Sequence, residues 1–249
     1  MSGHIVQIGD LELYYEDCGA GTPLVLLHGF GGSGQNWRPF VAELSEHHRL
    51  ILVYLRGHGH STNPTNQFTH REAASDVLFL LDKLGIDRFS AVGISSGGMA
   101  LLHMASQTRR IDSMVLVSAT SHFPDQARAI MRRASFATMP KPVQDMYREC
   151  AKRGDKQIYQ LIAQFNALHE NYDDMNFTAQ TLSTITARTL IVHGDRDNFF
   201  PVEIPVGLYR SIPDAALWII PGGNHVPIYE SSVPFVSTAL RFLDGPTSR

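Results

Sequence analysis

Short apolar runs recur along the chain with helix-like segments between them, and this alternation is the strongest constraint on the fold. The runs are Leu24–Leu27, Leu50–Tyr54, Ala91–Val92, Met114–Val117, Leu190–Val192 and Leu217–Ile220. Runs of this kind are typical of strands buried on both faces, as in a parallel sheet covered by helices. The sequence therefore predicts an α/β fold with a mostly parallel central sheet flanked by helices.

The segments around these strands carry turn and helix signals. Ile5–Ile8 and Leu11–Tyr15 flank Gly9-Asp10, which predicts an antiparallel hairpin at the sheet edge. The capping box Thr69-His70-Arg71-Glu72 predicts the start of a helix that ends at Gly85. Further helices are expected over 96–107, 202–211 and 231–243.

Residues 121–186 break this rhythm, because they show no strand pattern and carry Met and aromatic residues at roughly helical spacing. An ordinary crossover between parallel strands needs about a dozen residues, whereas this stretch has about 65. We therefore predict a helical lid, inserted into a core domain made of residues 1–120 and 187–249. A long crossover without a function of its own is the alternative.

The composition excludes several classes of function. The 249 residues are 43% hydrophobic and 18% charged, which is typical of a globular chain of one or two domains. A net charge of -3 without a basic run gives no footprint for nucleic acid or an anionic membrane. No apolar run is long enough to span a bilayer, and residues 1–4 lack the pattern of a secretory signal. With only Cys18 and Cys150, we expect a cytoplasmic protein without disulfides.

The segment Gly93-Ile94-Ser95-Ser96-Gly97 has the pattern G-x-S-x-G between a predicted strand and a predicted helix. A tight, strained turn there would project the Ser95 hydroxyl above the sheet, and the two glycines let the backbone pass closely. Because the pattern is centred on Ser95, we prefer it to Ser96 as a nucleophile. A phosphate-binding loop is the alternative, but neither G-x-G-x-x-G nor Gly-Lys-Ser/Thr occurs there.

A second glycine-rich loop, His28-Gly29-Phe30-Gly31-Gly32, follows the strand Leu24–Leu27. Such a loop can present free backbone amides, which in an acyl-transfer enzyme stabilise the developing oxyanion. We assign the Phe30 amide and the Ser96 amide to this oxyanion hole. A simple turn without a function is the alternative.

With these motifs the chain resembles the α/β-hydrolase family over roughly residues 5–245. Three further motifs follow in the family's order, Arg56-Gly57-His58-Gly59-His60-Ser61, His193-Gly194-Asp195-Arg196-Asp197 with Pro201, and Gly222-Gly223-Asn224-His225. The resemblance implies the α/β-hydrolase fold and a triad in the order Ser…Asp…His. There are two departures: Tyr54 and Leu55 stand where relatives usually carry Asp, and Ile94 stands where His is frequent.

The resemblance implies that Asp197 is the acid of the triad and His225 the base. Asp195 is the rival acid, and we interpret it as a turn residue that bonds its own backbone. Some relatives carry the acid one strand earlier, but Ser118–Ser121 contains no carboxylate. In the expected mechanism His225 takes the proton of Ser95 and returns it to the leaving group, while Asp197 holds the imidazole in the right tautomer.

The histidine pairs His58/His60 and His47/His48 invite a metal interpretation. We reject it, because no set of Cys or carboxylate residues with ligand spacing accompanies them. We expect neither a metal nor another cofactor.

We expect substrate specificity to depend on the insertion and on Phe30, Trp37, Ser96, Val226 and Pro227. Met-rich lid helices most often pack on each other, but they can also line an adaptable apolar pocket. The favoured activity is that of a serine hydrolase, a carboxylesterase that cleaves small or medium esters through an acyl-enzyme, with lactones next.

Other activities remain open. The alternatives are a carbon–carbon bond hydrolase, a cofactor-free haloperoxidase or perhydrolase, and a ligand sensor that turns over slowly. A haloalkane dehalogenase is excluded, because its nucleophile would be an Asp where this chain has Ser95.

Overall fold

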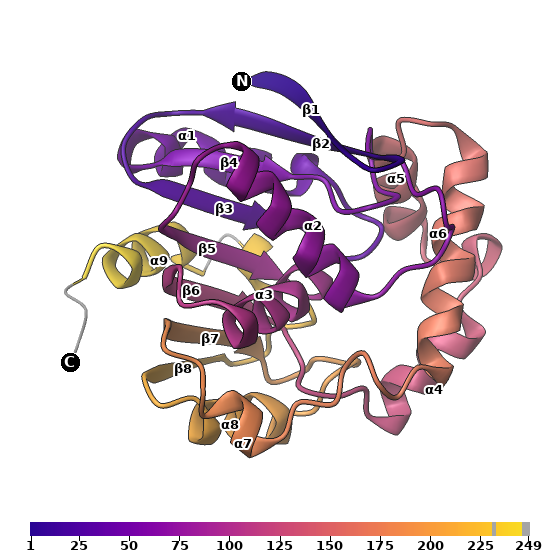
Figure 1. Ribbon diagram of the computed structural model, residues 1–249. Helices are drawn as coiled ribbons and strands as arrows, with labels where there is room; N and C mark the ends of the chain where they lie inside the picture. Colours follow the sequence, from indigo (N-terminus) through magenta and orange to yellow (C-terminus); the bar gives the residue numbers. More distant parts are fainter. Residues whose placement is uncertain (231–232, 246–249) are drawn as a thin grey trace.

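The central sheet confirms the predicted α/β architecture. The computed structural model describes residues 1–230 and 233–245 (Figure 1), and these form one eight-stranded sheet in the order β1-β2-β4-β3-β5-β6-β7-β8. The strands are β1 Ser2–Ile8, β2 Leu11–Cys18, β3 Pro23–Leu27, β4 Arg49–Val53, β5 Phe89–Ile94, β6 Ile111–Val117, β7 Arg188–Gly194 and β8 Ala215–Ile220. The first two form the predicted antiparallel hairpin, and all pairs from β3 to β8 are parallel.

The helices lie close to the predicted positions. In the described part of the chain they are α1 Arg38–His47, α2 His70–Lys83, α3 Ser96–Gln107, α4 Asp125–Arg133, α5 Lys141–Cys150, α6 Asp155–Ala167, α7 Ala179–Leu182, α8 Glu203–Ser211 and α9 Phe235–Leu243. The helix expected over 231–243 thus begins at Phe235, and the first two positions of that prediction lie outside the described residues.

The capping box at α2 is only half formed. The Thr69 hydroxyl accepts a hydrogen bond from the Glu72 amide (3.1 Å), as predicted. The Glu72 carboxylate accepts from the Thr69 hydroxyl (3.0 Å) rather than from its amide, and it also pairs with Arg56 (3.0 Å). The guanidinium therefore competes for the carboxylate that the sequence pattern assigned to the cap.

Alternate residues of each parallel strand enter two separate cores, because successive strand side chains point to opposite faces. On β3, Val25 and Leu27 belong to the core beneath α2, α3 and α8, whereas Leu24 and Leu26 belong to the core with α1 and α9. Figure 1 shows α2 and α3 in front of the sheet and α1 and α9 behind it. The sheet is thus covered on both faces, as its unbroken apolar strands require.

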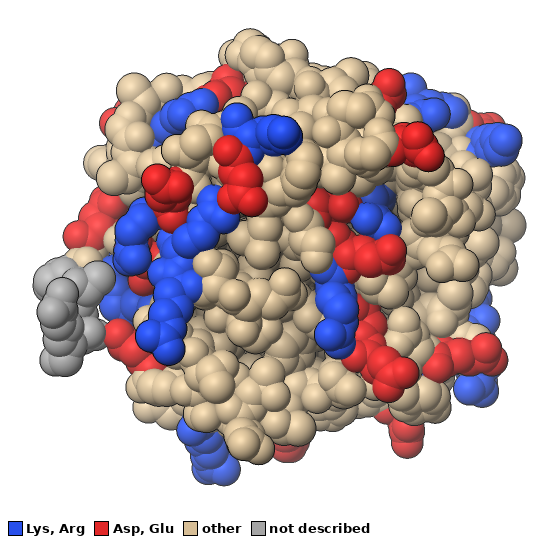
Figure 2. All heavy atoms as spheres, in the orientation of Figure 1, with Lys and Arg blue, Asp and Glu red and all other residues tan. Residues whose placement is uncertain are grey.

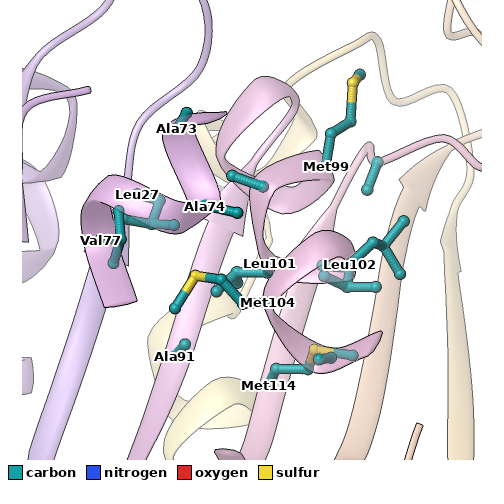
Figure 3. Packing of buried hydrophobic residues seen from close by; sticks show 14 of the residues in the cluster. Leu27, Ala73, Ala74, Val77, Ala91, Met99, Leu101, Leu102, Met104 and Met114 are labelled. Carbon is teal, nitrogen blue, oxygen red and sulfur yellow. The ribbon is translucent and has the colours of Figure 1, made fainter. Parts of the chain in front are cut away.

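Small side chains let α2 and α3 approach each other on the front face. Ala74 of α2 lies near Leu101 of α3, and both are buried (Figure 3). This packing holds α3 against α2, and α3 begins directly after Ser95.

Residues 121–186 form helices α4 to α7, together with two short 3₁₀ turns and a single β-bridge between His122 and Asn176. The predicted lack of a strand there is confirmed. In Figure 1 the arrowheads of β3 and β5 point towards α4, α5 and α6, so these helices lie beyond the carboxyl ends of the parallel strands. This is the edge of the sheet where α/β proteins place their ligands.

Charged side chains of both signs are interspersed over the face in Figure 2. Over residues 1–230 and 233–245, no helix has the length and apolar character needed to cross a membrane. Cys18 and Cys150 are both free thiols.

Two buried histidines tie the loops at the carboxyl edge together. His28 donates from Nδ1 to the Gly29 carbonyl (2.8 Å), and its Nε2 accepts from the Leu55 amide (3.0 Å). His58 donates from Nδ1 to the Arg56 carbonyl (2.9 Å). Burial lowers the pKa of His28 to about 3 and that of His58 to about 4, so both rings are neutral at neutral pH.

These depressed pKa values predict a loss of stability in mild acid. An unfolded histidine takes up a proton near pH 6.5, whereas folded His28 and His58 do so only near pH 3 and 4. The free energy of unfolding should therefore fall between pH 6.5 and 4.5, by up to about 1.4 kcal/mol per pH unit for each histidine. Urea titrations at several pH values measure this slope, and His58→Asn should make it shallower. An equally steep slope in His58→Asn would contradict the assignment.

Candidate active site

The turn between β5 and α3 holds Ser95 in a strained conformation. Ser95 has φ +50° and ψ −114°, in the left-handed range of φ that non-glycine residues rarely adopt. The turn is possible because its glycines are tightly enclosed. A Cβ on Gly93 would lie 2.5 Å from the Gly97 carbonyl carbon, and a Cβ on Gly97 would lie 2.2 Å from the Leu27 oxygen. Both glycines are therefore needed for close backbone contact, as the motif predicted.

Gly97→Ala should destabilise the fold by about 3 kcal/mol or more, because the new methyl group meets backbone rather than a movable side chain. Gly207→Ala is the matched control, since Gly207 lies in α8 with open space around its Cβ position. That control should raise the free energy of unfolding by about 0.5–1 kcal/mol. Urea unfolding of both variants measures the difference. Similar small effects would show that the turn tolerates a Cβ.

The three residues predicted to form a triad lie in one hydrogen-bonded chain. His225 Nε2 is 3.0 Å from Ser95 Oγ, and His225 Nδ1 is 2.8 Å from Asp197 Oδ2. The three come from the turns after β5, β7 and β8, all at the carboxyl edge of the sheet. With its Nδ1 proton donated to the carboxylate, His225 is free to accept the Ser95 proton at Nε2.

Asp197 is fully enclosed and held on both of its oxygens. Oδ1 accepts from the amides of Phe199 (2.7 Å) and Phe200 (3.2 Å), while Oδ2 faces His225. Burial alone raises the pKa of the Asp197 carboxyl, but the His225 and Phe199 hydrogen bonds outweigh it, and the pKa is lowered. The group is thus an oriented carboxylate at neutral pH.

Asp195 has a different position from the one expected. It does not bond its own turn, because its Oδ1 accepts from the Gly222 amide (2.6 Å) in the loop that carries His225. The Arg196 amide donates to the Gly223 carbonyl (2.9 Å) beside it. Asp195 therefore joins the loop that carries Asp197 to the loop that carries His225, and the Asp195 side chain is one-third exposed.

The backbone amides of Phe30 and Ser96 are the donors predicted for an oxyanion hole. Within the described residues, no hydrogen bond uses the amides of Phe30 and Ser96. The Phe30 loop is held by the Gly32 amide bonded to the Gly29 carbonyl (3.0 Å) and by the His28 ring. Gly31 has φ +76°, and a Cβ there would clash with the Tyr147 ring at 2.3 Å. The loop is therefore fixed between the sheet and α5.

A cavity of about 390 Å³ opens at Ser95, which is the range of small-molecule sites. Residues 121–186 supply much of its apolar wall, namely Phe123, Met131, Met139, Val143, Met146, Tyr147, Phe165 and Leu168. The core supplies the remainder, namely Gly29, Phe30, Gly32, Asn36, His70, Ile94, Ser95, Ser96, Met99, Asn198, Phe199, Phe200, His225, Val226 and Tyr229. Phe30, Ser96 and Val226, which the sequence analysis expected in the substrate site, line this cavity.

Trp37 and Pro227 do not line this cavity, so the structure corrects their predicted place in the substrate site. Trp37 is completely buried in the core with α1 and α9, where it packs against Phe40. The neighbouring Asn36 and the more distant Tyr229 face the cavity instead, and the Tyr229 hydroxyl donates to the Asn36 carbonyl (3.0 Å). A 3₁₀ turn over Gly34–Trp37 rotates Trp37 away, which the loop sequence did not reveal.

Several other cavity residues were missed by the sequence analysis, among them His70 and Phe199. His70 was interpreted only as part of a helix cap, yet its ring lines the cavity. Phe199 follows the acid and stacks near His225, with ring centroids 4.7 Å apart. Its position two residues after Asp197 was the only signal available.

Over residues 1–230 and 233–245, no three His, Cys, Asp or Glu side chains are grouped so that they could hold a metal ion. His58 instead packs edge-on against Phe30, with ring centroids 4.9 Å apart.

The sequence of residues 22–165 matches the alpha/beta hydrolase fold family, and the chain belongs to this family. Its fold, with a strained serine at the β5–α3 turn, is that of an α/β hydrolase.

Three relatives illustrate how varied the similar proteins are. A putative non-heme chloroperoxidase from Synechocystis is 28% identical, with 86% of this chain and 88% of the relative covered. A 2-hydroxy-6-oxo-2,4-heptadienoate hydrolase from Pseudomonas putida is 28% identical (97% and 96% covered). A pimeloyl-[acyl-carrier protein] methyl ester esterase from Vibrio vulnificus is 26% identical (93% and 98% covered).

Among solved structures, a meta-cleavage product hydrolase, CumD, superimposes with a TM-score of 0.83 at 21% identity, with 98% of each chain covered. At that identity the likeness shows the shared fold. Together with the family match, the relatives support hydrolase activity on a small molecule.

Proposed function

We propose that this protein is a serine hydrolase that cleaves small or medium carboxylic esters through an acyl-enzyme. The observation that carries the proposal is the chain Ser95–His225–Asp197, with contacts of 3.0 and 2.8 Å, at the edge of a largely apolar cavity. The relative that acts on a methyl ester supports the same class of substrate.

In the proposed mechanism His225 Nε2 takes the Ser95 proton while Ser95 Oγ attacks the ester carbonyl. The amides of Phe30 and Ser96 stabilise the oxyanion of the tetrahedral intermediate. His225 then gives its proton to the leaving alcohol, and the acyl group stays on Ser95. A water molecule, deprotonated by His225, attacks the acyl-enzyme, and the carboxylic acid leaves as Ser95 regains its proton. Asp197 holds the ring and balances the imidazolium throughout.

We propose that residues 121–186 act as a lid domain over the core domain of residues 1–120 and 187–249. Three Met side chains of this segment, Met131, Met139 and Met146, face the cavity. Because Met is unbranched and flexible, such a wall suits acyl chains of more than one shape.

A carbon–carbon bond hydrolase is the second candidate, since one relative is a 2-hydroxy-6-oxo-2,4-heptadienoate hydrolase and covers nearly the whole chain. The hydrogen-bonded residues Ser95, His225 and Asp197 would also serve this reaction. Lactones are cyclic esters and need no change in the mechanism.

Two free thiols, Cys18 and Cys150, suit a reducing compartment, so we propose a cytoplasmic location.

Ser95→Ala should abolish turnover, with a loss on the order of 10⁴ or more in kcat, because no acyl-enzyme can form. The measurement is a panel of p-nitrophenyl esters, lactones and vinylogous diketones, run with wild type and both serine variants. Ser96→Ala keeps its backbone amide and should retain most turnover of a simple ester. If Ser96→Ala is the inactive variant, the nucleophile is misassigned. Fast turnover of diketones alone would favour the second candidate, and a single slow turnover would indicate a sensor.

Asp197→Asn should lower kcat by roughly 10⁴. The amides of Phe199 and Phe200 need an acceptor, so the Asn oxygen stays with them and its NH₂ group faces His225. His225 Nδ1 must then accept the hydrogen bond, so the ring proton moves to Nε2. A protonated Nε2 cannot take the proton of Ser95. The measurement is kcat/KM on one ester.

Asp195→Asn is the matched control. An Asn oxygen can still accept from the Gly222 amide, so this variant should lose less than about tenfold. Circular dichroism should be native for both variants. A severe loss in Asp195→Asn with a mild one in Asp197→Asn would reverse the acid assignment.

A further inference from the structure

A second Ser–His–Asp chain lies beside the first and is not used by the proposed mechanism. His70 Nε2 is 3.1 Å from Ser96 Oγ, and His70 Nδ1 is 2.6 Å from Asp174 Oδ2. All three side chains are almost completely buried, and both Ser96 and His70 line the cavity. Ser96 begins α3, His70 begins α2, and Asp174 belongs to the insertion.

The Asp174 carboxylate accepts hydrogen bonds from several groups besides the His70 ring. Its oxygens also accept from the amides of His70 (2.8 Å) and Arg71 (3.0 Å) in the first turn of α2, and His103 Nε2 lies 3.5 Å away. Burial alone raises the pKa of the Asp174 carboxyl, but the hydrogen bonds from His103 and His70 hold it well below its usual value. Asp174 is therefore an ionised acceptor, and His70 Nδ1 carries a proton.

The position of this proton decides what Ser96 presents to the cavity. In the neutral imidazole with a proton on Nδ1, Nε2 accepts from the Ser96 hydroxyl. The Ser96 oxygen then has only lone pairs left to offer a bound molecule. The wall of the cavity is largely apolar, with four Met and five Phe side chains, so a substrate donor has few polar partners there besides Ser96.

We propose that the Asp174–His70–Ser96 chain is a specificity subsite, which binds a hydroxyl or amide N–H group in the acyl part of the substrate. The inference rests on the proposed esterase function and narrows its substrate class. We assign the donor to the acyl part because His225, which serves the leaving group in the proposed mechanism, is bonded to Ser95, whereas the Ser96 hydroxyl is bonded to a different histidine, His70. Ser96 thereby has two separate roles, with its amide in the oxyanion hole and its hydroxyl in recognition.

The test compares kcat/KM for ethyl butanoate, ethyl 2-hydroxybutanoate and ethyl 2-methoxybutanoate in wild type and in Ser96→Ala. Differences in the intrinsic reactivity of the esters cancel, because each variant is measured with the same three. Ser96→Ala should lower the ratio of hydroxy to unsubstituted ester by about threefold to tenfold, which is the worth of one neutral hydrogen bond. The ratio of methoxy to unsubstituted ester should not change, because a methoxy group has no proton to donate.

His70→Phe should lower the same ratio, and the double variant should lower it no further, since one hydrogen-bonded chain is broken in each case. If His70→Phe does not fold, Ser96→Ala carries the test, because it leaves His70 and Asp174 paired. Ser113→Ala is the matched control. Ser113 is buried and bonded to Ser90 Oγ (2.9 Å), away from the cavity, so its loss should leave the ratio unchanged.

The outcomes separate the subsite from the esterase function. Equal ratios in wild type and Ser96→Ala, with all three esters hydrolysed, would overturn the subsite alone. Equal falls for hydroxy and methoxy esters would show that Ser96 donates, which overturns the assignment of a donor on the substrate. If mass spectrometry detects acylation of Ser96 in the Ser95→Ala variant, Ser96 is a second nucleophile and its assignment as a binding subsite is wrong. No hydrolysis of any ester by wild type would overturn the esterase function and the subsite together.

Discussion

The contact of Gly97 with the end of β3 is the constraint on which the site depends. A Cβ on Gly97 would lie 2.2 Å from the Leu27 oxygen, so only glycine lets α3 begin this close to the sheet. At this turn Ser95 has φ +50°, and among the described residues no hydrogen bond uses the amide of Ser96 at the start of the helix. The same turn thereby positions the proposed nucleophile and one half of the proposed oxyanion hole. Such strain persists only where the surrounding packing enforces it, and α2 and the sheet do so here.

Adjacent serines on this turn are bonded to separate histidines. Ser95 faces His225 and Ser96 faces His70, at 3.0 and 3.1 Å. Neighbouring side chains diverge at the start of a helix, so the two hydroxyls reach different walls of the cavity. The first histidine comes from a loop after a core strand, whereas the second is held by a carboxylate of the insertion, Asp174. Residues 121–186 therefore reach the turn between β5 and α3 through hydrogen bonds as well as through apolar side chains.

Local steric requirements explain which parts of the site could be predicted from the sequence. The glycines of the G-x-S-x-G pattern, Gly93 and Gly97, indicate a close backbone approach around Ser95. The strands of the sheet are indicated by their apolar runs. Side-chain direction in loops has no comparable signal. Trp37 sits beside a cavity residue, yet one 3₁₀ turn buries it in the opposite core. Asp195 is two residues from Asp197, and only the pairing of two loops gives it the Gly222 amide.

By itself the sequence determined the α/β layering and the edge of the sheet where the candidate site lies, and its resemblance to the family suggested the order Ser, Asp, His of the proposed triad. The layering follows from apolar periodicity and the turn around Ser95 from a short motif, and the physical causes of both act within a few residues. Only the tertiary structure decided that His70 reaches Ser96 and that Asp174 reaches His70, because these contacts join residues 26 and 104 positions apart. A contact across such a separation depends on how the helices α2 and α3 and the insertion pack together, and no local pattern encodes that packing.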